Sequence, residues 1–268
     1  MKEQVKKWLE QGIVDIFLGY RMVEGHPLPH FFVKERLEEV EELVTGPARY
    51  PLEKMAIKVA EEDQDIKIGL LARDCNQRAL NVLFVWPQLA PENVKWLPVS
   101  CCPSQLKEQV DCSLLSPTET ASSKKGIGIE NHMDIEDVKA FSGDERFKRW
   151  MYEFEKCIKC YGCRDACPVC FCKECSLEHD DLVSTGDLPV EVPIFHWVRA
   201  MHMAGRCVDC GLCEEACPMD IPLRALYRMV NQIVMDLFEY KAGIDSKQSP
   251  FNILGDQVTL EPKDLSAA

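Results

Sequence analysis

Two cysteine runs with the same spacing constrain this chain more than any other feature. The first run has the spacing C-x2-C-x2-C-x3-C and consists of Cys157, Cys160, Cys163 and Cys167, with Pro168 next. The second run repeats the spacing with Cys207, Cys210, Cys213 and Cys217, with Pro218 next. A single C-x2-C pair is a weak signal, but two full copies predict a fold organised around bound metal.

The spacing is that of two-cluster bacterial ferredoxins, in which the fourth cysteine of each run binds the other cluster. We therefore expect one 4Fe-4S cluster on Cys157, Cys160, Cys163 and Cys217. We expect a second 4Fe-4S cluster on Cys207, Cys210, Cys213 and Cys167. This crossed ligation would join the two runs and make metal binding part of folding. The alternative metal is zinc, which takes soft ligands at C-x2-C spacings but does not need four cysteines in each run.

Such clusters predict electron transfer rather than bond chemistry. In a four-cysteine cluster every iron is coordinated, whereas a catalytic metal site keeps an open position for substrate. The sequence contains no GxSxG, HExxH or P-loop motif, and the glycines at 126–131 do not form GxGxxG. We therefore expect no catalytic residues, and a non-catalytic subunit fits the sequence better than an enzyme.

Residues between and beside the cysteines predict the surroundings of the clusters. Gly162 and Gly211 stand where the chain must turn tightly around a cluster. Lys159, Arg164 and Arg206 lie within or next to the runs, where cations would stabilise reduced clusters. His196 and His202 precede the second run on an expected helix, and we interpret them as packed or surface residues rather than as iron ligands.

Seven of the 15 cysteines lie outside the ferredoxin spacing, namely Cys75, Cys101, Cys102, Cys112, Cys170, Cys172 and Cys175. One interpretation is a third 4Fe-4S cluster on Cys170, Cys172, Cys175 and Cys75. The other is that these thiols are small buried groups, or lie beside the clusters without binding them. The sequence leaves both interpretations open.

Charge and hydropathy exclude some classes of partner. The chain has 268 residues and a net charge of -13, with no basic stripe, which argues against a nucleic-acid partner. No apolar run approaches the roughly 18 residues of a membrane span. The N-terminus lacks the apolar core of a signal peptide, and thiol-rich proteins without disulfides are typical of reducing compartments. We expect a cytoplasmic protein without a membrane span.

Periodicity predicts an α+β fold in two domains. We expect a small α/β domain over 1–115, a linker or mobile loop over 116–145, a helix-rich dicluster ferredoxin domain over 146–243 and an extended tail over 244–268. Expected helices include 5–11, 33–44 and 51–62, and expected strands are 14–20, 66–72 and 94–100. A final helix should begin near Pro222 and stop at Gly243.

Beyond the cysteines, several stretches carry a family resemblance. The segments 154–175 (FEKCIKCYGCRDACPVCFCKEC) and 195–223, with the helix ending LFEYKAG, resemble iron–sulfur beta-type subunits of formate dehydrogenases and hydrogenases. The segments IKIGLLARDCNQRAL and VKWLPVSCC are similar to the beta-subunit domain of deazaflavin-reducing hydrogenases and formate dehydrogenases. Together these matches cover most of the chain.

The resemblance implies an accessory subunit of an anaerobic redox complex. Its partners would be flavoprotein, heterodisulfide-reductase-like, hydrogenase or formate dehydrogenase subunits, between which it would relay single electrons. The family domain often carries a flavin and a further cysteine pair. The stretch 116–145 lacks that pair, which argues against flavin in this chain. The alternative function is a flavin-containing oxidoreductase subunit that reduces a soluble coenzyme.

Overall fold

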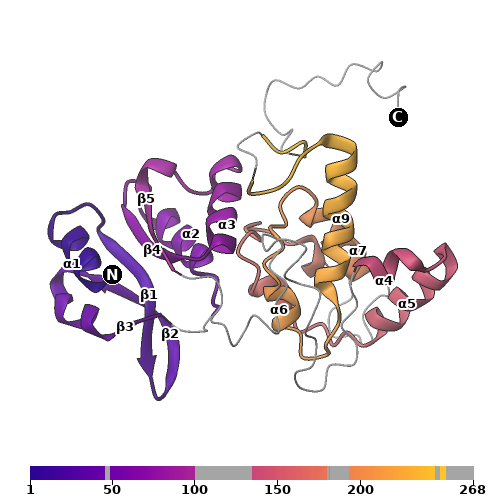
Figure 1. Cartoon of the computed structure of the whole chain (residues 1–268), viewed down its shortest axis with the longest axis horizontal. Coiled ribbons are helices and arrows are strands. Elements are labelled where there is room, and N and C mark those ends of the chain that lie inside the picture. The colour runs from indigo at the N-terminus through magenta and orange to yellow at the C-terminus, as the bar shows by residue number, and fades with distance from the viewer. Residues whose placement is uncertain (46–48, 100–134, 180, 182–192, 245–247, 252–268) are drawn as a thin grey trace.

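The computed structural model describes residues 1–45, 49–99, 135–179, 181, 193–244 and 248–251. The predicted boundary between 115 and 116, three of the extra cysteines (Cys101, Cys102 and Cys112) and most of the predicted tail lie outside these residues. Figure 1 shows the mixed sheet and its helices in the left part of the molecule and a helix-rich part at the right. The predicted α+β class is therefore confirmed. Within the described ranges, no helix is long and apolar enough to cross a membrane.

The N-terminal part is built on a five-stranded sheet with the order β2-β1-β4-β5, in which β3 also pairs with β1. Its strands are β1 Ile16–Val23, β2 His26–Val33, β3 Leu43–Val44, β4 Ile68–Ala72 and β5 Val94–Pro98. Strands β1, β4 and β5 are parallel, whereas β2 and β3 run antiparallel to β1. Every residue of β4 is buried, as expected of a central parallel strand that is covered on both faces.

The hairpin between β1 and β2 is a feature that the sequence analysis missed. Glu24 and Gly25 both have positive φ angles, 49° and 83°, as a two-residue type I′ turn requires. Strand β2 contains Pro27 and Pro29, which argue against a strand but are tolerated at the edge of a sheet.

The prediction of an α-helix at 33–44 is wrong. The chain forms a 3-10 helix (η1, Lys34–Glu42) that kinks at Arg36, and then enters β3. The other elements expected in this domain are present with small shifts of their ends.

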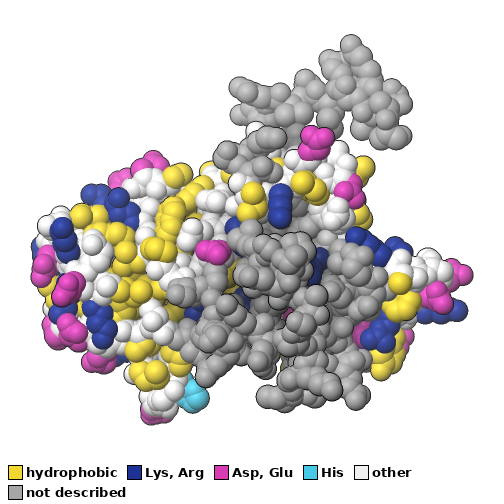
Figure 2. Space-filling view, viewed as in Figure 1, with side chains coloured by type: hydrophobic (Ala, Val, Ile, Leu, Met, Phe, Trp, Pro, Cys, Tyr) yellow, Lys and Arg dark blue, Asp and Glu magenta, His cyan; other side chains and the backbone are white. Residues whose placement is uncertain are grey.

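Three helices cover the sheet, namely α1 Lys2–Glu10, α2 Leu52–Glu62 and α3 Asp74–Val85. In the view of Figure 2, hydrophobic side chains gather over this part of the molecule and charged side chains lie along its rim. Helix α3 serves two cores. Leu80 and Leu83 pack into the core of the sheet, whereas Ala79 and Val82 pack into the core that surrounds the cysteine runs.

The C-terminal part consists of α4 Ile135–Ala140, α5 Gly143–Glu155, α6 Gly162–Asp165, η3 Ser176–Glu178, α7 Ile194–Met203, α8 Leu212–Glu215 and α9 Leu223–Phe238. The last residues of the predicted linker are therefore helical rather than irregular. Helix α5 begins at a capping box, in which the Ser142 side chain accepts from the Glu145 amide and the Glu145 carboxylate accepts from the Ser142 amide.

Helix α9 ends earlier than predicted. Glu239 takes a left-handed conformation with a φ of 48° and ends the helix directly after Phe238. Gly243 lies beyond this end, and a Cβ atom there would overlap the main chain of Arg78. Gly243 is therefore needed where the chain passes α3 closely, and not as the stop signal of α9.

Four side chains of the sheet domain bind main-chain carbonyls of the C-terminal part. Lys54 Nζ donates to Asp165 O over 3.2 Å, and Arg49 donates to Cys210 O. Arg78 Nε and Nη2 donate to Val208 O over 3.2 and 3.0 Å. Asn81 Nδ2 donates to Gly243 O over 2.9 Å. The sheet domain therefore holds the loops of both cysteine runs.

One buried acid lies between the helices that make these contacts. Glu53 on α2 is fully buried and accepts a 2.7 Å hydrogen bond from Asn76 Nδ2 on α3. Burial raises the pKa of Glu53 from its usual 4.5 to about 7. Between these pH values the native state binds more protons than the unfolded chain, so the free energy of unfolding falls as pH rises.

Replacing this acid should remove that pH dependence. As pH rises from 5 to 8, the free energy of unfolding of Glu53→Gln should increase by on the order of 3 kcal/mol relative to that of the wild type. The measurement is anoxic denaturant unfolding across this pH range. Glu61→Gln on the same helix is the control, because Glu61 bonds Lys58 at the surface and should leave the profile unchanged. Parallel pH profiles for the wild type and Glu53→Gln would contradict the expectation.

Candidate metal centre

The first cavity of interest is lined by four cysteines from both runs, namely Cys157, Cys160, Cys163 and Cys217. Cys157 follows α5, and its amide donates to Phe154 O over 3.0 Å. Cys163 lies on the short helix α6, and Cys217 lies just after α8. Apolar side chains complete the wall, among them Ile158, Phe195 and Leu223.

The second cavity repeats this arrangement with Cys207, Cys210, Cys213 and Cys167. Cys207 follows α7 as Cys157 follows α5, and its amide donates to Met203 O over 3.0 Å. Its wall also contains Val169, Arg199 and Tyr227. The structure thus brings each predicted set of four thiols to one cavity.

The two loops share the same backbone path. Between the first and third cysteines, the left-handed residues are Lys159 and Tyr161 in the first run, and Asp209 and Gly211 in the second. This path turns main-chain N–H groups toward the sulfurs. The amide of Lys159 donates to Cys157 Sγ over 3.4 Å, and the amide of Asp209 bonds Cys207 in the same way. Such hydrogen bonds stabilise a thiolate that binds iron.

The two predicted glycines have different roles. Gly211 has a φ of +79°, as a tight turn requires. Gly162 begins α6 without a positive φ, and Tyr161 holds the left-handed conformation instead. A Cβ atom on Gly162 would lie 2.9 Å from Ala216 O. Gly162 therefore allows the first run to approach the second.

Burial disfavours the ionised form of several of these thiols. It raises the pKa of Cys163 to about 11 and that of Cys207 to about 12. Burial also raises the pKa values of Cys210 and Cys213 well above their usual range. Ionising several buried thiols around one cavity requires cations among them, and iron supplies these when a cluster binds. Four soft sulfur donors around one cavity are the ligand set of a 4Fe-4S cluster.

No three His, Cys, Asp or Glu side chains of the described residues come close enough together to hold a single metal ion. The cysteines of each set instead surround a space. Hydrophobic side chains form much of the wall of each space.

Side chains other than cysteine complete the surroundings. His196 is buried, stacks on Phe154 with ring centroids 4.6 Å apart, and has a pKa lowered to about 4 by burial. It is a packed neutral residue, as expected. Arg164 and Arg206 line neither of the two cavities. Arg164 pairs with Asp165 and Glu178, and Arg206 lies over the Trp86 ring at 3.9 Å.

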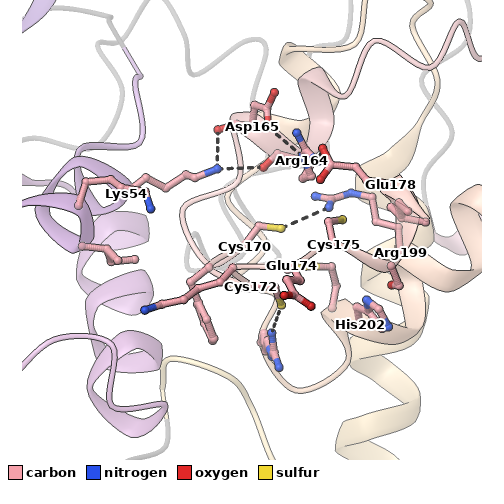
Figure 3. A pocket seen from close by; sticks show the side chains of 18 of the residues that line it. Lys54, Arg164, Asp165, Cys170, Cys172, Glu174, Cys175, Glu178, Arg199 and His202 are labelled. Atoms are coloured by element: carbon pink, nitrogen blue, oxygen red, sulfur yellow. Dashed lines mark hydrogen bonds and ion pairs between the residues drawn. The ribbon is translucent and has the colours of Figure 1, made fainter. Parts of the chain in front are cut away.

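A third cavity, of about 280 Å³, lies between α2 and the first cysteine run. Figure 3 shows Cys170, Cys172 and Cys175 around it, with Lys54 entering from α2. Arg199 Nη1 donates to Cys170 Sγ over 3.7 Å, and Arg206 Nη1 donates to Cys172 Sγ over 3.6 Å. Cys75 is not among the residues that line this cavity.

Cys75 lies on α3, directly after β4, as the sequence predicts. Burial raises its pKa, and its charged neighbours are Arg49, Glu53, Arg78 and Arg73. Its thiol also interacts with that of Cys210 in the second cavity. The structure therefore brings three of the four cysteines of the predicted third set together and puts Cys75 beside the second set.

Sequence reasoning missed the residue that connects these cavities. Arg199 on α7 lines both the second and the third cavity, and its Nη2 donates to Cys163 O over 2.7 Å. It lies within the predicted helix that precedes the second run. An arginine on the buried face of an amphipathic helix was the available signal, because such a residue needs an anionic partner.

The contact between Gly162 and Ala216 predicts the effect of a single methyl group. We expect Gly162→Ala to force the two runs apart, to cost about 1–3 kcal/mol of stability and to lower iron retention. Iron content and anoxic thermal unfolding measure both effects. Gly143→Ala is the control, because a Cβ atom at Gly143 meets no atom within 4 Å. Equal iron retention and stability in the two variants would show that the close approach is unimportant.

Comparison with known proteins identifies the part of the chain that carries this site. Residues 156–222 match the 4Fe-4S dicluster domain family. The F420-dependent formate dehydrogenase subunit beta of Methanocaldococcus jannaschii is 45% identical over 107 residues, which cover 40% of this chain and 28% of that protein. The F420-dependent formate dehydrogenase 1 subunit beta of Methanococcus maripaludis is 42% identical over 139 residues, covering 48% of this chain and 36% of that protein.

The chain thus spans about a third of the length of the curated relatives that it matches. The match to the dicluster domain supports iron–sulfur clusters as the cofactors of the cysteine-rich part. The predicted resemblance is confirmed: the chain carries a 4Fe-4S dicluster domain and is similar, over part of its length, to formate dehydrogenase beta subunits.

Proposed function

We propose that this chain is an electron-transfer subunit that relays single electrons through two 4Fe-4S clusters. One cluster would be held by Cys157, Cys160, Cys163 and Cys217, and the other by Cys207, Cys210, Cys213 and Cys167. The observation that carries the proposal is the pair of cavities, each lined by three cysteines of one run and the last cysteine of the other.

The chemistry of the two cavities supports a relay. Each cluster would have a full set of cysteine ligands, which leaves no iron open to substrate. Apolar walls and N–H groups that point at the sulfurs set the reduction potential of a bound cluster. One side of the first site reaches the surface, since Cys160 is exposed and Ile158 beside it is 45% exposed. An electron can enter or leave there.

The relatives supply the class of partner. They are named as subunits of formate dehydrogenase, and we propose that this chain likewise works beside other redox subunits, of flavoprotein, heterodisulfide-reductase-like, hydrogenase or formate dehydrogenase type. A complex in the cytoplasm fits thiols that must remain reduced until iron binds. Anoxic purification of the native complex and identification of its chains tests this part.

Crossed ligation is tested by comparing cysteine variants from the two runs. We expect Cys217→Ser to remove the same cluster as Cys160→Ser, although Cys217 lies in the second run. Cys167→Ser should remove the same cluster as Cys210→Ser. Iron analysis should fall from about eight to about four atoms per chain in each variant, and EPR spectra identify which cluster remains. If Cys217→Ser instead matches Cys210→Ser, each run binds its own cluster and the pairing is wrong.

The same iron analysis tests the third cluster that the sequence left open. The proposal above predicts about eight irons per chain, whereas a third cluster on Cys170, Cys172, Cys175 and Cys75 predicts about twelve. Cys172→Ser is the matched variant. Unchanged iron in Cys172→Ser would leave this thiol as a neighbour of the clusters, and a loss of about four irons would establish the third site.

A second candidate function is suggested by the relatives, whose names describe them as F420-dependent. Under this alternative the chain is a flavin-containing oxidoreductase subunit that reduces a soluble coenzyme. The isolated chain should then show a flavin absorption spectrum and turn over the coenzyme with an artificial electron donor. Iron–sulfur absorption without flavin, together with no turnover, would favour the relay.

A further inference from the structure

Arg199 is a buried cation that has no carboxylate partner among the residues that the structure describes. It lies on α7 and is 3% exposed. Its guanidinium donates to the main-chain oxygen of Cys163 over 2.7 Å and to Cys170 Sγ over 3.7 Å, and it lies 5.8 Å from the ring centre of Tyr227. Its Nε is buried without a hydrogen-bond partner. Within the described part of the chain, no ion pair joins it to Asp or Glu.

The other buried arginine in the described residues of this domain is neutralised. Arg224 pairs with Asp209 over 2.6 Å, although it too is almost fully buried and lines the second cavity. A buried guanidinium without an anion is costly, since it cannot lose its proton at accessible pH. The protein therefore has to supply negative charge near Arg199 by other means.

Sulfurs of both cysteine sets interact electrostatically with Arg199. They are those of Cys163 in the first set and of Cys167 and Cys213 in the second, and the sulfur of Cys170 beside them does the same. Arg199 also forms part of the wall of the second cavity, while its bond to Cys163 O fixes it to the first run. It therefore lies between the two cysteine sets and contacts both.

We propose that Arg199 is the shared counter-ion of two iron–sulfur clusters and favours the reduced state of both. This inference rests on the proposed function, because it requires a cluster in each cavity. One electron from a low-potential donor adds one negative charge to a cluster that already has four thiolate ligands. A fixed cation between the clusters stabilises that added charge in either of them, and reduces the repulsion between two added electrons.

Arg199 would thus set how readily the chain accepts electrons. A unit charge at roughly 12 Å, with an effective dielectric constant of about 20, changes a one-electron equilibrium about tenfold. That change corresponds to about 59 mV in reduction potential. The effect should reach both clusters, because Arg199 touches elements of both sets.

The experiment is an anoxic redox titration of the full chain, followed by EPR, for the wild type and three variants. Arg199→Met removes the charge and keeps an unbranched side chain, whereas Arg199→Lys keeps the charge. Arg206→Gln is the matched control, since Arg206 is a neighbouring cation that donates to Cys172 Sγ but lines neither cluster cavity. Iron content is measured first in all four proteins.

We expect both potentials in Arg199→Met to become more negative by about 59 mV or more. In Arg199→Lys, which keeps the charge, the potentials should be shifted by no more than half as much. The potentials of Arg206→Gln should stay close to those of the wild type. Unchanged potentials in Arg199→Met, a shift of one cluster only, or an equal shift in Arg206→Gln would overturn the proposal. Loss of iron from both Arg199 variants would assign this residue to folding and overturn it as well. Wild-type protein without two clusters would instead refute the proposed function itself.

Discussion

The structure depends on a set of four cysteine ligands at each cavity, which no single segment of the chain can supply. Three cysteines of one run and the fourth of the other face the same cavity, so the two loops must be brought together before either site is complete. The main chains meet where Gly162 passes the carbonyl of Ala216. Iron then supplies the positive charge that lets deeply buried thiols ionise, which links the binding of metal to the packing of the domain.

The sheet domain takes part in this arrangement although it contributes no cysteine to either set. Helix α3 has one face in the core of the sheet and the other in the core around the clusters. Lys54, Arg49 and Arg78 bind main-chain oxygens of the two cysteine loops. The surroundings of both cysteine sets are thus shaped by residues that are more than a hundred positions away in the chain.

The sequence predicted those features that spacing and periodicity encode. Each predicted set of four cysteines lines one cavity, and the buried strand β4 and the start of α3 beside Cys75 lie where expected. It could not reveal what depends on contacts between distant segments. The edge strand β2 was hidden by its prolines, Gly162 serves a close approach to another loop, and the role of Arg199 depends on which sulfurs surround its helix.

The bond between Arg78 and Val208 has a consequence for the electronic behaviour of the second site. Val208 O belongs to the same peptide group as the Asp209 amide, which bonds the sulfur of Cys207. With a guanidinium at its oxygen, this planar unit is polarised so that its hydrogen end becomes a stronger donor toward the sulfur. The charge of a side chain on α3 is in this way transmitted through a rigid amide to the sulfur of Cys207, and the sheet domain influences the electron density on a proposed iron ligand.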